Sequence, residues 1–298
     1  RRGGKGAVGM ETKDEDSVAH LLVSNTHSDL LFFTNTGKVY QVKTYEIPEG
    51  SRTSKGKAIQ NFLSLSSSEI ITSILQAGKG TVIKKKTEKG KNHNADEGFI
   101  VMATKNGIIK KVAIEEFESV RRSGLTAIKL KKDDVLLWAR LSSGKDDITL
   151  VTKWGQAIRF GEKDVRPMGR TASGVRGIRL KKIDVLIGMD ITKQENLAEA
   201  QLLVVTENGF GKKTSLKEYK RQRRGGSGIK TGKITAKNGY LVGAELILPE
   251  KEEIIAISKK GQVIKTALSS IPTLSRATQG VRIMKLESGD SLASATTF

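Results

Sequence analysis

The feature that most constrains the fold of this chain is an internal repeat. A short apolar run, a Thr or Ser, two more residues, a Gly and a second run with Lys or Arg occur together five times. The glycines of this first pattern are Gly37, Gly107, Gly155, Gly209 and Gly261. They are 48 to 54 residues apart after a first interval of 70. Self-similarity at such a spacing predicts one structural unit that is repeated and packed against its neighbours.

A second pattern follows each copy of the first. It consists of an Arg, small residues, a Gly and an alternating apolar segment, and its glycines are Gly56, Gly124, Gly174, Gly228 and Gly280. Each of these glycines comes 19 residues after the first-pattern glycine, or 17 residues in one copy. Residues 1–10 hold a further second pattern, centred on Gly6, with no first pattern ahead of it. We therefore expect five complete units and one partial unit.

Within a unit, apolar residues alternate with a period of two in short runs rich in Val, Ile and Thr. This period is typical of β-strands, and the glycine between the first two runs predicts a tight hairpin turn. A third and a fourth strand follow, as in residues 174–191. Four strands in roughly 50 residues indicate a blade of a propeller-like ring. Pro48, Pro167 and Pro272 recur 11 or 12 residues after the first-pattern glycine, so the segments around them are expected to be loops rather than helices.

The expected fold is therefore all-β, a ring of four-stranded antiparallel blades in one domain over residues 1–298. The expected units are residues 1–27 (partial), 28–78, 97–145, 146–193, 200–249 and 252–298. Residues 78–98 form an insertion with six lysines. This basic insertion is either a solvated loop or an additional contact to nucleic acid.

The sequence offers no catalytic or metal-binding motif. Residues 4–9 match G-x-G-x-x-G, but no strand precedes them and no helix pattern follows, so a dinucleotide site is not expected. The chain has no cysteine, and its three histidines lack partners at metal-ligand spacing. Acid pairs such as Asp133 with Asp134 lie between strands, where turn geometry explains them. No apolar run reaches the roughly 18 residues that cross a membrane.

The basic residues follow the repeat. The chain carries 52 Lys plus Arg and 32 Asp plus Glu, a formal net charge of +20. Basic side chains recur on the second hairpin strand and at the start of the second pattern, and they form a belt if the blades close into a ring. Such a belt can hold a polyanion. Its candidate residues are Lys38, Lys43, Arg52, Lys55, Lys110, Lys111, Arg121, Arg122, Arg159, Arg170, Arg176, Lys212, Lys213, Arg223, Arg224, Lys265 and Arg276.

The missing residue types indicate which polyanion the belt holds. Aromatic residues make up 5% of the chain and recur in neither pattern, so stacking platforms for single strands are not expected. No recognition helix is predicted either. The remaining partner is double-stranded DNA, bound through its phosphates without strong sequence preference. Several blades must contribute, because bending DNA costs energy.

Residues 1–6, RRGGKG, resemble the gyrase A box, Q-[RK]-R-G-G-[RK]-G, without its leading Gln. Together with the repeat, they make the whole chain similar to the family of C-terminal domains of the DNA gyrase A subunit. This resemblance implies a six-bladed β-pinwheel. It also maps the DNA-binding box onto Arg1, Arg2, Gly3, Gly4, Lys5 and Gly6. A second box-like segment, at residues 222–228, departs from the pattern because Ser227 replaces a basic residue.

The resemblance further implies a function. Domains of this family bind and bend duplex DNA around a basic rim and wrap it with positive handedness, so that the holoenzyme introduces negative supercoils at the expense of ATP. The holoenzyme is a type II DNA topoisomerase. By the same resemblance, this chain carries no catalytic residue and no cofactor, since ATP and Mg²⁺ act elsewhere in the assembly.

The implied partners are duplex DNA and the other parts of an A2B2 gyrase assembly, which are the rest of the A protein and the B protein, with no membrane. The implied location is the bacterial cytoplasm at the nucleoid, and the isolated domain is expected to be monomeric. Two alternatives stay open. One is the C-terminal domain of topoisomerase IV, which has degenerate boxes. The other is a protein-binding β-propeller, which would not require this charge in register.

Overall fold

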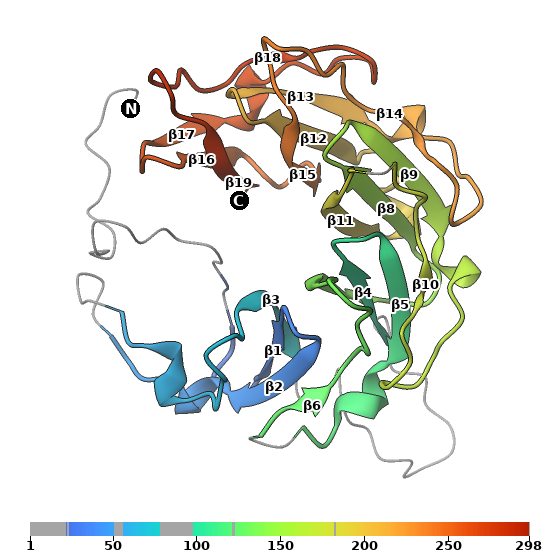
Figure 1. Ribbon diagram of the computed structural model, residues 1–298, viewed down its shortest axis with the longest axis vertical. Helices are drawn as coiled ribbons and strands as arrows, with labels where there is room; N and C mark the ends of the chain where they lie inside the picture. Colours follow the sequence, from blue (N-terminus) through green and yellow to red (C-terminus); the bar gives the residue numbers. More distant parts are fainter. Residues whose placement is uncertain are drawn as a thin grey trace.

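The computed structural model of the chain describes residue 22 and residues 24–50, 56–77, 98–120, 123–181 and 183–297. These residues form an all-β fold in which five sheets surround a central axis (Figure 1). Within these ranges, no helix is both long and apolar enough to span a membrane.

Each sheet is built on a β-hairpin whose turn holds a first-pattern glycine. The hairpins are β1 (Asp29–Thr34) with β2 (Lys38–Lys43), β4 (Phe99–Thr104) with β5 (Ile108–Ala113), β8 (Asp147–Thr152) with β9 (Gln156–Gly161), β12 (Gln201–Thr206) with β13 (Phe210–Ser215), and β16 (Glu253–Ser258) with β17 (Val263–Ala267). The five turn glycines have φ between +76° and +83°, which residues with a Cβ rarely adopt. The predicted hairpins are thus confirmed.

The third strand of each sheet pairs antiparallel with the first hairpin strand. These inner strands are β3 (Ile71–Ala77), β7 (Leu136–Ser142), β11 (Leu186–Thr192), β15 (Leu241–Ile247) and β19 (Leu292–Thr297). Figure 1 shows β3, β11, β15 and β19 facing the centre of the ring. Inner strands therefore form the hub, and the hairpins radiate outward from it.

The fourth strand of a sheet comes from the following unit. These outer strands are β6 (Leu125–Thr126), β10 (Val175–Arg176), β14 (Ile229–Lys230) and β18 (Val281–Arg282). They pair with β2, β5, β9 and β13 respectively, each in the preceding sheet. From the second described hairpin onward, the chain thus leaves each hairpin, adds a short strand to the previous sheet and returns as the inner strand of its own sheet. The sequence did not predict this exchange of strands.

The described residues contain five blades, where the resemblance predicted six. We number the blades by their hairpins, from blade 1 (β3-β1-β2-β6) to blade 5 (β17-β16-β19), which has three strands in the part of the chain that is described. The difference arises because the unit expected at residues 1–27 falls almost entirely on residues 1–21 and 23, which lie outside the described residues. The expected four-stranded antiparallel architecture is present in blades 1 to 4.

Hydrophobic cores lie between neighbouring blades, so the hairpins are buried on both faces. In β4, Ile100 and Met102 pack against blade 1, whereas Val101 and Ala103 pack against blade 3. The apolar run of β4 is therefore continuous, as is usual for strands covered on both sides. The face of blade 1 that points away from blade 2 is covered by residues 59–65.

Short 3-10 turns lie between the strands; the one at residues 59–61 falls in the alternating apolar segment of a second pattern. They are η1 (Thr44–Glu46), η2 (Ile59–Asn61), η3 (Ile114–Phe117), η4 (Glu162–Asp164), η5 (Gln194–Asn196), η6 (Leu216–Glu218) and η7 (Leu268–Ser270). Five of them follow a second hairpin strand directly. They turn the chain toward the rim of the ring, where the outer strands lie.

Candidate nucleic-acid interface

The rim of the ring is formed by the outer strands and by the loops that lead to them. We call residues 165–174, 219–228 and 271–280 the rim loops of blades 2, 3 and 4. Each runs beside the second hairpin strand of its blade through a parallel bridge, for example between Lys111 and Pro167. Each rim loop then continues into β10, β14 or β18. Figure 1 shows these three strands at the periphery.

A first row of cations lies on the outer strands. The second residues of β10, β14 and β18 are Arg176, Lys230 and Arg282, and all three are exposed. The corresponding residue of β6 is Thr126. Because the outer strand is the last strand of its sheet, this row follows the rim from one blade to the next.

A second row of cations lies three residues further along the chain. Its members are Lys129, Arg179, Lys233 and Lys285, each exposed and each five residues after a second-pattern glycine. The backbone N–H groups of the first three donate to carbonyl oxygens in the next rim loop, at 3.2, 2.8 and 3.1 Å. This row therefore marks the places where consecutive rim segments are joined.

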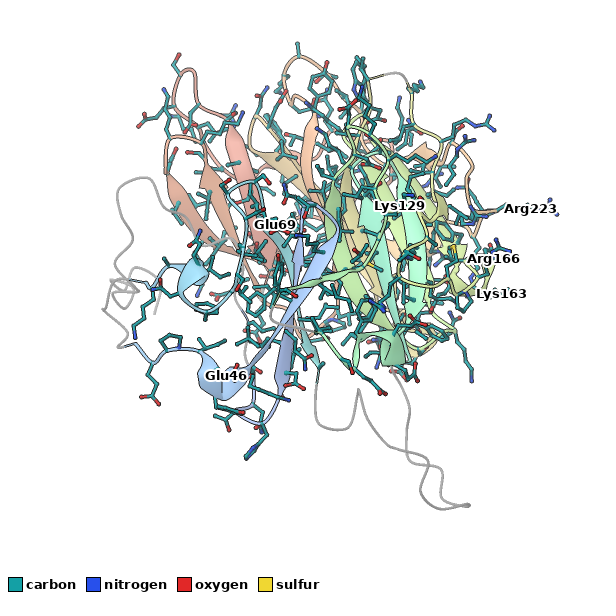
Figure 2. All side chains as sticks on the ribbon, turned by 60° about the horizontal axis from the view of Figure 1, so that its bottom comes forward. Glu46, Glu69, Lys129, Lys163, Arg166 and Arg223 are labelled. Carbon is teal, nitrogen blue, oxygen red and sulfur yellow. The ribbon has the colours of Figure 1, made fainter. Side chains whose placement is uncertain are left out.

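Further exposed cations surround the rim loop of blade 3. Lys163 is in η4, Arg166 is near the start of the rim loop of blade 2, and Arg223 is in the rim loop of blade 3. Figure 2 shows the three side chains projecting from the same outer edge. Among the described residues, none of the three pairs with an acid within salt-bridge distance. Their charges are thus available to a ligand.

The predicted lysine pairs on β5 and β13 are not part of this surface. Lys110, Lys111 and Lys212 are 0%, 4% and 1% exposed, and Lys213 is partly buried. Their ammonium groups hydrogen-bond mainly to carbonyl oxygens of loops that arrive from the following unit, so they cannot reach a ligand outside. The prediction that these lysines line the outer belt is wrong. A lysine on a second hairpin strand is covered wherever a rim loop crosses it.

Four other predicted cations are paired with acids of their own blades. Lys38 lies 3.3 Å from Glu69, Lys43 2.5 Å from Asp29, Arg159 3.6 Å from Asp147 and Lys265 2.5 Å from Glu253. Burial lowers the pKa of Arg159, against the effect of the neighbouring Asp147. The three lysines remain partly exposed. Their charge is nevertheless balanced locally, unlike that of the two rows.

The arginines that open the second pattern connect neighbouring segments of the rim. Arg170 and Arg276 lie 3.3 and 3.8 Å from Glu116 and Glu218, in the 3-10 turns of the blades that hold their loops. Arg224 donates to the backbone oxygen of Asp164 at 3.0 Å. Arg224 and Arg276 also donate to the carbonyls of Arg176 and Lys230, on the previous outer strand. These side chains reach the rim, but they serve mainly as bridges within it.

Ten predicted residues lie outside the described residues, so their placement stays a prediction. They are Arg1, Arg2, Gly3, Gly4, Lys5, Gly6, Arg52, Lys55, Arg121 and Arg122. The lysine-rich insertion falls in the same category at residues 78–97.

The acid pairs serve the fold, as the sequence indicated. Asp134 Oδ2 accepts a hydrogen bond from Thr104 Oγ1 at 2.6 Å, and Asp134 Oδ1 accepts one from the N–H of Asn106 at 3.0 Å. Asp146 likewise accepts hydrogen bonds from the N–H and hydroxyl of Ser143. These contacts fix turns between strands. No cluster of three or more potential metal ligands occurs within the described ranges.

The sequence contained a signal for the second row, which becomes visible when positions are counted from the second-pattern glycines. Counted from Gly124, Gly174, Gly228 and Gly280, the fifth residue is always Lys or Arg. The second residue is Arg or Lys in three of these four copies. Aligning the units on the second glycine would have found Lys129, Arg179, Lys230, Lys233, Arg282 and Lys285.

A family of known proteins matches nearly the whole chain. The family model for the DNA gyrase C-terminal domain, a β-propeller, matches residues 1–25, 28–77, 98–143, 146–193, 200–247 and 252–298. This chain belongs to that family. Six matched segments correspond to the five complete units and the partial unit of the repeat.

Full-length gyrase A proteins support this family. The chain is 41% identical over 288 residues to the DNA gyrase A subunit of Staphylococcus epidermidis, and 40% identical over 285 residues to that of Staphylococcus aureus strain MRSA252. These matches cover 97% and 96% of this chain but only 30% of each relative.

Two solved structures share the fold. The C-terminal domain of DNA topoisomerase IV has a TM-score of 0.80 at 24% identity, covering 96% of this chain and 84% of the other. A DNA gyrase A C-terminal domain has a TM-score of 0.73 at 25% identity, covering 97% and 91%.

Proposed function

We propose that this gyrase-family domain bends double-stranded DNA around its rim and wraps it with positive handedness. The observation that carries the proposal is the repetition of exposed, unneutralised cations at the same two places on consecutive blades. Each such cation can contact one phosphate group, and the curved row imposes its curvature on the DNA. Contacts of this kind position a duplex without reading its bases.

The chain spans about 30% of the gyrase A relatives that it matches, and the activity of the whole protein is inferred from them. We propose that the complete gyrase A protein works together with the gyrase B protein as an ATP-dependent type II topoisomerase in the bacterial cytoplasm. In this proposal, the wrapped DNA is presented for strand passage, so that negative supercoils result. ATP and Mg²⁺ act outside this domain.

We also propose that residues 1–25 complete a sixth blade. The family model matches these residues as a separate unit, and β17 pairs only with β16 in the described part of the chain. After Gly6, the sequence continues with Ala7 and Val8, which correspond to the two residues of each outer strand. The box at residues 1–6 would then lie on the rim, where it can contact DNA.

The proposal is tested by measuring the topology of bound DNA. A nicked circle is ligated with the 298-residue chain bound, and the change in linking number is read after the protein is removed. The row variant replaces Lys129, Arg179, Lys233 and Lys285 with Gln. Its matched control replaces the acid-paired lysines Lys38, Lys43, Lys251 and Lys265 with Gln, and so loses the same charge.

Wild type and control are expected to give a positive change in linking number, and the row variant is expected to lose most of it. A domain that leaves linking number unchanged while binding tightly would contradict the wrap. If the control and the row variant lose it equally, the rows are not the binding track.

The topoisomerase IV C-terminal domain is a second candidate, favoured by its TM-score of 0.80. At 24% identity, this similarity supports only the fold, whereas the family model and the gyrase A relatives match nearly the whole sequence. Supercoiling of relaxed circles by the reconstituted full-length enzyme distinguishes the two. Relaxation of supercoils without their introduction would favour topoisomerase IV.

A further inference from the structure

Two lysines at the base of the rim loops have no part in the surface described above. Lys110 on β5 and Lys212 on β13 lie three residues after their turn glycines, and their exposed fractions are 0% and 1%. An ammonium group has three donors and no acceptor, and burying it is costly unless acceptors surround it. Each of these lysines therefore has to be explained by the groups around it.

Lys110 joins two consecutive segments of the rim. Its Nζ donates to the carbonyl oxygens of Ala127 at 2.9 Å and Ala172 at 3.0 Å, and also to that of Arg170. Arg170 and Ala172 belong to the rim loop of blade 2, whereas Ala127 directly follows outer strand β6 of blade 1. The N–H of Lys129 also donates to Ala172 O, at 3.2 Å. The ammonium group thus lies beneath the junction at which the second row of cations passes between blades 1 and 2.

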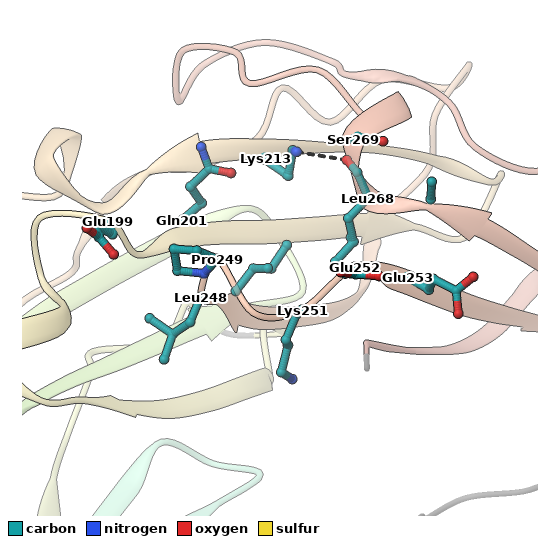
Figure 3. A pocket seen from close by; sticks show the side chains of 12 residues that line it. Glu199, Gln201, Lys213, Leu248, Pro249, Lys251, Glu252, Glu253, Leu268 and Ser269 are labelled. Carbon is teal, nitrogen blue, oxygen red and sulfur yellow. Dashed lines mark hydrogen bonds between the residues drawn. The ribbon is translucent and has the colours of Figure 1, made fainter.

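Lys212 occupies the same place beneath the rim loop of blade 4. Its Nζ donates to the carbonyl oxygens of Ser275 at 2.6 Å and Arg276 at 2.5 Å. The following residue, Lys213, donates to Leu268 O at 2.7 Å, in the 3-10 turn of blade 5. Figure 3 shows this bond beside a cavity of about 630 Å³ between blades 4 and 5.

Blade 2 repeats this second contact. There, Lys111 donates to the carbonyl oxygen of Glu162 at 3.3 Å and lies 3.4 Å from its carboxylate. Glu162 begins the 3-10 turn of blade 3. In blades 2 and 4, two adjacent buried or partly buried lysines thus bind the following unit. The first lysine of each pair binds the rim loop, and the second binds the 3-10 turn. The same device in two separate blades indicates a function rather than an accident of packing.

Blade 3 has no buried lysine beneath its rim loop; the loop's Arg221 is instead paired with a buried carboxylate of β8. Ile158 takes the position of Lys110, and a carbon added at Gly226 would lie 3.5 Å from its Cδ1. This rim loop has two adjacent glycines, Gly225 and Gly226, which let the backbone pack on an apolar side chain. The rim loops of blades 2 and 4 lack that pair and expose carbonyl groups to the lysine instead. Blade 3 can therefore be compared with blades 2 and 4 to judge what the buried lysine does.

We propose that Lys110 and Lys212 are positioning residues that fix the rim loops of blades 2 and 4 in register with the neighbouring blades. The inference rests on the proposed function, because register matters only if the rim carries DNA. Without the ammonium group, carbonyl groups of the loop lose their donor and the loop opens locally. The exposed cations on and beside it then no longer follow one curve.

The test uses Lys110→Met and Lys212→Met in the 298-residue chain, since Met keeps the length of the side chain without its charge. Lys105→Met and Lys217→Met are the controls, because both lysines are exposed in the same two blades. Amide hydrogen exchange is measured without DNA in the three rim loops. Linking-number change on ligated nicked circles and affinity for a short duplex are measured in parallel.

In each lysine variant, exchange is expected to rise by about tenfold or more in the affected rim loop, with no change in the rim loop of blade 3. Linking-number change is expected to fall by roughly half while affinity for a short duplex changes little. Exchange equal to that of the controls would overturn the proposal, as would unaltered wrapping. If a Met variant does not fold, the Ile variant, which carries the residue found at the equivalent position of blade 3, is measured with the same criteria.

The measurements distinguish failure of the proposed function from failure of the positioning role. A wild-type chain that does not wrap DNA overturns the proposed function, whatever the exchange results. A wild-type chain that wraps DNA, combined with Met variants that wrap it equally well, overturns only the positioning role.

Discussion

The two rows of cations make a quantitative prediction about salt. Each phosphate contact contributes about 0.9 to the slope of log affinity against log salt for duplex DNA. If Lys129, Arg179, Lys233 and Lys285 contact one phosphate each, replacing them with Gln should lower the slope by roughly 3.6. Between 50 and 200 mM salt, the wild-type affinity should then fall about 150-fold more than the affinity of the variant.

The measurement is fluorescence anisotropy with a labelled duplex over that range of salt. The control replaces Lys38, Lys43, Lys251 and Lys265 with Gln. These lysines are paired with acids 2.5 to 3.3 Å away, or in salt-bridge contact in the case of Lys251 and Glu245, so the control loses equal charge while its slope should change much less. Equal slopes for the two variants would show that only net charge matters and would refute the assignment of the rows.

Three further predictions concern stability and are measured by urea unfolding. Gly209→Ala should destabilise the domain by about 2 kcal/mol or more, because φ is +76° and the added carbon would lie 2.4 Å from Met284 O; Gly169→Ala, which faces open space, should have little effect. Burial raises the pKa of Glu69, but hydrogen bonds from a backbone N–H and two hydroxyl groups outweigh it and bring the pKa from 4.5 to about 2. The stabilisation from this carboxylate is therefore complete above pH 4.5 and lost as the pH falls toward 2, and a Glu69→Gln variant whose acid limb matches the wild type would contradict this. Burial lowers the pKa of Lys212 from 10.5 to about 8. Between those values the unfolded chain binds more protons at this group than the folded one, so Lys212 should make stability rise with pH by at most about 1.4 kcal/mol per unit. Lys212→Met should remove this part of the rise and leave the part due to Lys110, whose pKa burial also lowers to about 8.

Most of the repeat could be read from the sequence because it depends on local rules. A glycine between two apolar runs predicts a hairpin turn wherever it occurs, and the acid at Asp134 predicts a turn contact in the same way. The number of blades could not be confirmed from the described residues. The exchange of outer strands was missed because pairing between units leaves no trace in the period of either segment.

The candidate site, too, was predicted only in part from the sequence. Net charge and its repetition predicted a basic rim, and of the residues predicted for it Arg176 and Arg223 are exposed. Lys110 and Lys212 were wrongly predicted to be exposed, because they recur in the repeat as regularly as surface residues do. Exposure of a lysine on a second hairpin strand depends on whether a loop from the next unit covers it, and no property of the strand itself decides this.

The sequence by itself therefore determined that the chain forms hairpin-based units, that they repeat, and that positive charge accompanies the repeat. These properties depend on residues close together in the chain, where turn geometry and strand period operate. Only the tertiary structure decided which cations face outward and which lie beneath a loop. Burial is a property of the neighbours that a side chain acquires on folding, and here those neighbours come from the next blade.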